Sequence, residues 1–103
     1  RRDPVDVDLA KLWVTRDLLN LKRANKAIVT FNEITRQVSF PTWGHAWYLL
    51  THAQISDLQK RRDMAKTLYN RVIKMHANYP SSTILGMARA GLNQPFALKE
   101  PPL

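Results

Sequence analysis

The sequence has no cysteine, only three glycines and only eight acidic residues among its 103 residues. The absence of cysteine excludes disulfides, thiolate zinc sites and cysteine nucleophiles. The three isolated glycines form neither a phosphate-binding loop nor a dinucleotide-binding fingerprint. No uninterrupted apolar stretch approaches the roughly 20 residues that cross a membrane. These absences predict a soluble or peripheral protein.

Residues that carry out catalysis or bind metals are equally sparse. His45 and His52 share one face of an expected helix, but two turns, or roughly 10 Å, separate them, which is too far for one metal ion. The serines fall in no nucleophile-elbow pattern. We therefore predict that the protein is not an enzyme and has no catalytic residue, no cofactor, no metal site and no small-molecule substrate.

The length and the 45% apolar content predict one small folded domain. Helical periodicity dominates, and no hairpin dipeptide or sustained alternation of apolar and polar residues occurs. The predicted fold class is therefore all-α, a small bundle of four to five helices. We expect an irregular lead-in over residues 1–7, a single helical domain over 8–92, and an extended, proline-containing tail over 93–103.

The first half of the chain predicts two or three helical segments. Residues 9–23 are apolar on more than one side of a helix, so this helix needs two packing partners, either neighbouring helices or another protein. Residues 24–38 predict a continuation of this helix or a second one. Pro41 suits the first turn of a further helix that runs to about Ile55.

Polar residues predict where these helices begin and end. Asp6 or Asp8 is a candidate cap for the first helix. Thr30 and Glu33 also have capping-box spacing, which leaves the boundary of the second segment open. The clearest capping box is formed by Ser56 and Gln59, and it predicts a long helix that starts at residue 57 and ends near residue 78.

The last predicted helix is short. Ser81 or Ser82 caps its start. Gly91 supplies its stop by adopting the left-handed conformation, with Leu92 folding back on Met87.

Residues 43–80 carry a helix, a tight Ile55-Ser56-Asp57 turn, a second helix bearing Met64-Ala65-Lys66-Thr67-Leu68-Tyr69, and a closing proline. This stretch resembles a single helical hairpin of the pentatricopeptide or tetratricopeptide type. No second copy is visible, and solenoid repeats need several neighbours to bury their faces. The resemblance therefore implies a helical hairpin but no repeat code for reading bases.

Basic residues are the most informative feature for function, because sixteen of them against eight acids leave a net charge of +8. This charge favours RNA or an anionic membrane surface as the partner, while a solvated helix face is the alternative for any single lysine. The candidate residues for binding RNA or another partner are Lys22, Arg23, Lys26, Lys60, Arg61, Arg62, Lys66, Arg71 and Lys74. Arg61 projects into the apolar arc of its helix, where it extends to solvent, pairs with Asp57 or reaches a partner.

Aromatic residues have two interpretations. Trp13, Trp43 and Trp47 are of a type that stacks on RNA bases, but their helical spacing within apolar segments favours core positions. We expect the same of the rings of Phe31, Phe40, Tyr48 and Tyr69.

Together these features predict a structural subunit of an organellar, mitochondrial ribosome or another ribonucleoprotein, with protein neighbours and rRNA as partners. The alternative is an accessory subunit of a mitochondrial respiratory complex or ATP synthase, where the basic face meets acidic protein or anionic lipid. The chain opens with Arg1-Arg2-Asp3-Pro4 and no methionine, which suggests either a processed, mitochondrial protein or a piece of a longer chain.

Overall fold

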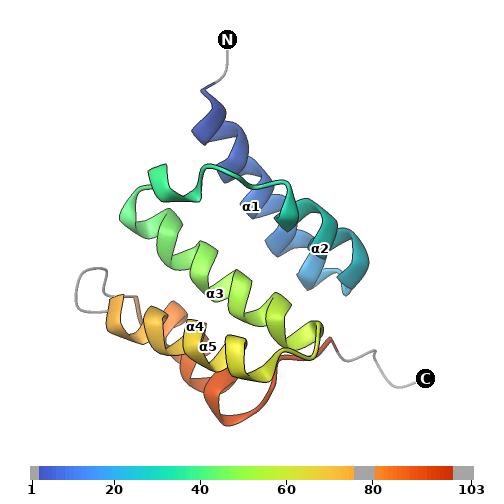
Figure 1. Ribbon diagram of the computed structural model, residues 1–103, viewed down its shortest axis with the longest axis vertical. Coiled ribbons are helices and arrows are strands. Elements are labelled where there is room, and N and C mark those ends of the chain that lie inside the picture. The colour runs from blue at the N-terminus through green and yellow to red at the C-terminus, as the bar shows by residue number, and fades with distance from the viewer. Residues whose placement is uncertain (1–2, 76–80, 99–103) are drawn as a thin grey trace. The chain divides into compact units, whose positions relative to one another are not determined.

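The computed structural model describes residues 3–75 and 81–98, and within these ranges it contains five α-helices, one short 3-10 helix and no strand (Figure 1). The elements are α1 (Pro4–Asn20), α2 (Ala24–Asn32), η1 (Gln37–Ser39), α3 (Thr42–Leu58), α4 (Arg62–Met75) and α5 (Ser82–Asn93). This confirms the all-α fold class. The helices form two compact units, the first ending at Phe40 and the second spanning Pro41–Ala97. The expectation of one domain over residues 8–92 stays a prediction.

The first unit is built on the packing of α1 against α2. Helix α1 begins at Pro4, because the side chain of Asp3 accepts a hydrogen bond of 2.8 Å from the Val5 amide and proline suits the first helical turn. The structure thus differs from the predicted irregular lead-in over residues 1–7, and neither Asp6 nor Asp8 is the cap. Helix α1 ends at Asn20, and α2 is a separate helix.

Asp8 has a different role, since it lies buried in α1. Its Oδ2 accepts hydrogen bonds from the backbone amides of Thr35 at 2.9 Å and Arg36 at 2.8 Å, and its Oδ1 lies 3.8 Å from Lys11 Nζ. The carboxylate therefore satisfies two amides just after α2 and ties that segment to α1. Thr30 lies within α2, so the Thr30–Glu33 spacing does not start a helix here.

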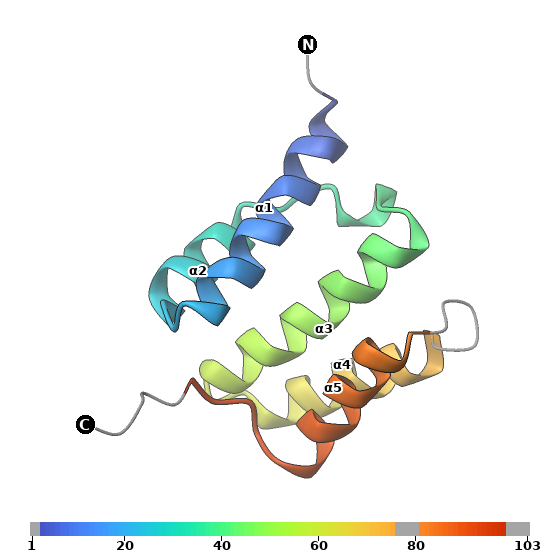
Figure 2. The same cartoon turned by 180° about the vertical axis from the view of Figure 1, so that it is seen from behind.

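The second unit consists of α3, α4 and α5, which pack on one another (Figure 2). Their buried side chains form an apolar core. The core residues are Ala46, Leu49, Leu50, Ala53, Ala65, Leu68, Tyr69, Val72, Ile84 and Ala88. Pro41 is the residue that precedes the first turn of α3, which confirms that a helix starts here. The α3–α4 pair forms a helical hairpin, while its resemblance to the pentatricopeptide or tetratricopeptide type stays a prediction.

The predicted capping box of Ser56 and Gln59 is wrong. Both residues belong to the end of α3, and the Ser56 hydroxyl donates a hydrogen bond of 2.8 Å to the His52 carbonyl within that helix. Helix α4 starts at Arg62, five residues later than expected at residue 57. The predicted end near residue 78 lies outside the described residues. The spacing was misleading because Ser56 also fits a helix interior when its hydroxyl bonds back to the preceding turn.

The predicted start of α5 is confirmed, whereas its predicted end is wrong. Ser81 is its N-cap, as its Oγ accepts a hydrogen bond of 3.3 Å from the Ile84 amide. Gly91 does not stop the helix, because α5 continues to Asn93 and no described glycine has a positive φ. Gly91 lies instead against the ring of Tyr69, where a Cβ would overlap three ring carbons. Glycine is required here by close packing.

The segment after α5 is non-helical up to Leu98. Part of this segment already has a partner within the chain, because the Phe96 amide donates a hydrogen bond of 2.9 Å to the Asp57 carboxylate. The start of the predicted tail is therefore held against the second unit by a buried acceptor.

Candidate nucleic-acid interface

Two helical turns, one in each unit, share the same backbone geometry and the same Lys-Arg dipeptide. In the α1–α2 turn, the Lys22 amide bonds to the Leu19 carbonyl at 3.0 Å and the Arg23 amide to the Leu18 carbonyl at 2.8 Å. In the α3–α4 turn, the amides of Lys60 and Arg61 make the equivalent bonds, to Asp57 at 3.0 Å and Ser56 at 2.8 Å. This pattern is the Schellman motif, which ends a helix through one left-handed residue.

The left-handed residue is a lysine in both turns. Lys22 has a φ of 62° and Lys60 a φ of 63°, and they are the only described residues other than glycine with positive φ. Glycine usually occupies this position because it has no Cβ to clash. Both turns also expose a lysine followed by an arginine: Lys22 and Arg23 in the first, and Lys60 and Arg61 in the second.

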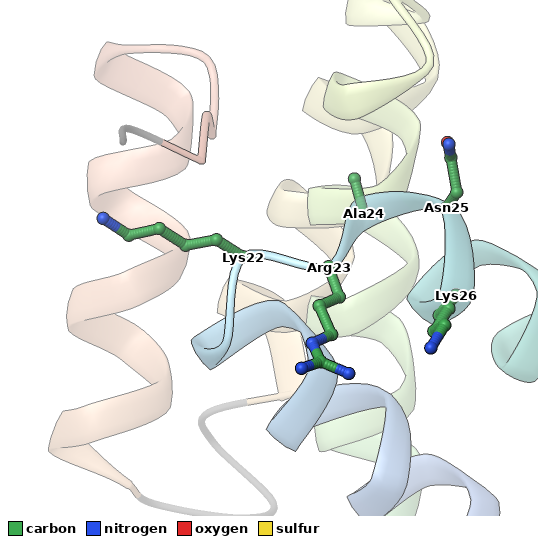
Figure 3. Close-up of a pocket in the computed structure, with 5 residues that line it drawn as sticks. All are labelled: Lys22, Arg23, Ala24, Asn25 and Lys26. Carbon is green, nitrogen blue, oxygen red and sulfur yellow. The ribbon is translucent and has the colours of Figure 1, made fainter. Parts of the chain in front are cut away.

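The α1–α2 turn forms a surface pocket lined by residues 22–26 (Figure 3). The side chains of Arg23 and Lys26 point to the same side of the turn, whereas Lys22 extends away from them. Arg23 precedes α2 without capping it through its side chain, so the first amides of α2 add their partial positive charge to the cations. All three predicted residues therefore line the turn at the helix join, but only Arg23 and Lys26 direct their side chains to the same side of it.

The predicted basic residues of α4 fall into two groups: three are exposed, and Arg62 is paired with an acid. Lys66, Arg71 and Lys74 are exposed on the side of the helix away from Ala65, Leu68 and Val72. Eight of the predicted binding residues are exposed and have no carboxylate partner among the described residues: Lys22, Arg23, Lys26, Lys60, Arg61, Lys66, Arg71 and Lys74.

Arg62 is the exception, because it has a structural partner. Its Nη1 lies 3.0 Å from both carboxylate oxygens of Asp57, and its Nη2 donates a hydrogen bond of 3.0 Å to the Leu92 carbonyl. The Asp57 side chain is only 1% exposed. Of the three alternatives for Arg61, pairing with Asp57 is therefore the one that the structure contradicts. Helix α4 starts later than the sequence suggested, which brings Arg62 and not Arg61 to the carboxylate.

The aromatic residues fall into a buried group and a partly exposed group. Phe31, Phe40 and Tyr69 are buried, and Trp47 packs against the core of the second unit, as expected. Trp13 is 38% exposed and Trp43 is 40% exposed, so neither is a fully buried core residue. The sequence did not separate these cases because helical spacing places a ring on a face without saying whether that face is covered.

Within the part of the chain that the structure describes, no three histidines or acids gather in a way that would hold a metal ion, and no helix is both long and apolar enough to cross a membrane. No family model matches the chain, and neither the curated proteins nor the solved structures contain a match.

Proposed function

We propose that this protein is a non-catalytic structural subunit of a ribonucleoprotein, such as a mitochondrial ribosome, and that it contacts RNA phosphates through its basic turns and the outer face of α4. The observation that carries this proposal is the set of eight exposed cations without a carboxylate partner among the described residues. Unpaired exposed cations attract a polyanion, and each phosphate contact releases a condensed counterion from the nucleic acid.

Salt-dependent RNA binding by the full chain tests this proposal. Affinity for a short RNA should fall linearly with the logarithm of salt concentration, with a slope of about 0.7 per contact for a single strand and about 0.9 for a duplex. Binding that is absent, or that ignores salt, would contradict the proposal.

A matched pair of double variants locates the contact. Arg23→Gln with Lys26→Gln removes two cations from the α1–α2 turn, whereas Arg36→Gln with Arg89→Gln removes two exposed cations from other positions. The first pair should lower the salt slope by about 1.4 and the second should leave it nearly unchanged. Equal losses would mean that net charge, and not the turn, attracts RNA.

A second candidate function is supported by exposed apolar side chains of the first unit. Val14 is 48% exposed on α1, Leu21 is 64% exposed in the turn, and Val29 is 63% exposed on α2. Val29 also lines a shallow apolar pocket of the first unit, together with Leu18, Asn25, Lys26 and Thr30. Such a surface suits a protein neighbour, as in an accessory subunit of a respiratory complex or ATP synthase. Binding to cardiolipin-containing vesicles and indifference to RNA would favour this alternative.

A further inference from the structure

The α1–α2 hairpin and the α3–α4 hairpin repeat one layout at an offset of 38 residues. Helices α1 and α3 both have 17 residues and start at Pro4 and Thr42, while α2 and α4 start at Ala24 and Arg62. This shared layout identifies the positions that hold a hairpin together. Every buried residue between positions 4 and 36 has a buried counterpart at the same offset: Asp8 and Ala46, Leu12 and Leu50, Thr15 and Ala53, Leu19 and Asp57, Ala27 and Ala65, Phe31 and Tyr69, and Ile34 and Val72.

Two exposed positions differ in polarity between the hairpins. Leu21 is 64% exposed and Val29 is 63% exposed, whereas the residues at the same positions of the α3–α4 hairpin, Gln59 and Thr67, are exposed and polar. An equivalent hairpin therefore forms without apolar side chains at these positions. The fold of the α1–α2 hairpin does not require Leu21 or Val29, so their exposure in water needs another explanation.

Both side chains belong to one apolar patch, formed by Val14, Leu18, Leu21 and Val29. Val14, Leu18 and Leu21 follow one another at intervals of four and three residues, so they form a stripe along α1 and its C-cap. This stripe is about 10 Å long, at 1.5 Å per residue. Leu18 and Val29 line the same shallow pocket, which joins the stripe to α2. The apolar patch is therefore continuous across both helices of the hairpin.

The rim of this pocket is more positive than the equivalent surface of the α3–α4 hairpin. Asn25 and Lys26 line the pocket, whereas Asp63 and Met64 occupy the same positions of the other hairpin. The α1–α2 hairpin thus lacks an acid and gains a cation there. Lys26 is exposed and has no carboxylate partner among the described residues. A partner that complements this surface combines an apolar side chain for the pocket with a carboxylate for Lys26.

A helix is the shape of partner that this patch fits. Two helices packed side by side leave a groove that receives a third helix, and the α3–α4 hairpin packs against such a helix, α5, within the chain. The described residues contain no strand whose edge an extended peptide could join. We propose that the apolar patch, with Lys26 at its rim, binds an amphipathic helix of a protein neighbour whose apolar face is flanked by carboxylates. This inference goes beyond the proposed function, because it names a protein partner and a surface that charge alone does not define.

A synthetic peptide tests this docking surface on the full chain. The probe is an amphipathic helix of about 18 residues with leucines along one face and glutamates beside them. The control peptide keeps the glutamates and has glutamine in place of leucine, because a chain of net charge +8 attracts any acidic peptide. The leucine peptide should shift the methyl resonances of Val14, Leu18, Leu21 and Val29, and the control peptide should not. Unshifted patch methyls at saturating leucine peptide would overturn the inference.

Exchanging residues between the two hairpins provides matched variants. Leu21→Gln with Val29→Thr introduces the residues of the α3–α4 hairpin and should weaken binding of the leucine peptide about tenfold. The reciprocal pair, Gln59→Leu with Thr67→Val, is the control and should leave this affinity unchanged. Lys26→Met should weaken binding several-fold and reduce its dependence on salt. Unchanged affinity in the first pair, or an equal gain in the reciprocal pair, would contradict the docking surface.

The outcomes separate this inference from the proposed function. Leu21→Gln with Val29→Thr leaves every charge in place, so the salt slope of RNA binding should not change. If the chain binds no RNA but binds the leucine peptide at the patch, only the proposed function is wrong. If it binds RNA and the patch methyls ignore the peptide, only the docking surface is wrong.

Two other occupants of the patch would be recognised with the same pair of substitutions. A chain that ignores the peptide but loses binding to anionic lipid vesicles in this pair docks on a membrane surface. A chain that loses self-association in sedimentation instead docks on a second copy of itself. Either result would overturn the inference. Circular dichroism checks the helical content of each variant, and should the pair fail to fold, the methyl shifts and Lys26→Met still decide the question.

Discussion

The hydroxyl of Tyr69 donates a hydrogen bond of 2.9 Å to Oδ2 of Asp57, and both side chains are buried. The same carboxylate accepts from Arg62 and from the Phe96 amide. One acid thus connects the end of α3, the first turn and the middle of α4, and the segment after α5. Since a buried carboxylate is tolerated only when its oxygens are satisfied, these four groups depend on one another.

Replacing Asp57 with asparagine should destabilise the protein by about 3 kcal/mol. The change leaves the Arg62 charge without its partner in a half-buried position and turns an acceptor oxygen into a donor. Urea denaturation followed by circular dichroism measures the free energy of unfolding. Asp63→Asn is the matched control, because Asp63 is exposed, and it should cost less than about 1 kcal/mol. Equal effects would contradict the central role of Asp57.

Two glycines of α5 should respond in opposite directions to alanine. Gly91→Ala places a methyl group inside the ring of Tyr69, and we expect a loss of roughly 1–3 kcal/mol because a buried ring cannot move aside freely. Gly86→Ala meets nothing within 4 Å and should gain roughly 0.5–1 kcal/mol in helix propensity. Thermal unfolding of both variants checks the prediction, and a stabilised Gly91→Ala variant would contradict the observed packing.

The free energy of unfolding should decrease as the pH falls below about 6.5, partly because of His52. Burial, followed by the charges of Arg71 and Arg61, lowers the pKa of His52 in the folded state. The unfolded chain therefore takes up a proton at a higher pH than the folded chain, so the contribution is complete above 6.5 and is lost on acidification toward the lowered value. His52→Gln should flatten this part of the stability profile, measured by urea denaturation at several pH values. An identical slope in the variant would refute this assignment.

Lys60→Gly should raise stability by up to about 1 kcal/mol, because glycine adopts the left-handed conformation without strain. The same variant should bind RNA more weakly, since it loses an exposed cation. Lys66→Gly is the control: Lys66 lies inside α4, so glycine there should cost about 1 kcal/mol while removing the same charge. Denaturation and RNA-binding measurements on both variants test these opposite expectations. A destabilised Lys60→Gly variant would argue against the left-handed turn.

The helices were predictable because their periodicity and their strongest breaks are local properties. Pro41 and Ser81 marked helix starts correctly, since each acts within one turn of the backbone. The partners of Asp57 were not predicted, because they lie 5, 12 and 39 residues away and only the fold brings them together. Gly91 was misjudged for the same reason: the Tyr69 ring that demands a glycine belongs to another helix.

The candidate interface was predictable in composition but not in arrangement. Net charge and clustering identified the exposed cations, yet they also included Arg62, whose role is structural. The recurrence of Lys-Arg in both helical turns was a detectable signal, because Lys22-Arg23 and Lys60-Arg61 each follow the last turn of an apolar-patterned helix. The influence of Arg61 and Arg71 on His52 required the structure, as it depends on how α3 and α4 pack.

Under the proposed function, the two left-handed lysines have opposite effects on folding and on RNA binding. Selection for stability alone would favour glycine at positions 22 and 60, where the backbone is left-handed. Such replacements should leave the helical content of the isolated chain unchanged. They would be penalised only where the turns meet an anionic surface. Comparing the survival of Lys22→Gly and Lys60→Gly inside a cell with their behaviour in a test tube would therefore reveal whether the chain works in isolation or as part of something larger.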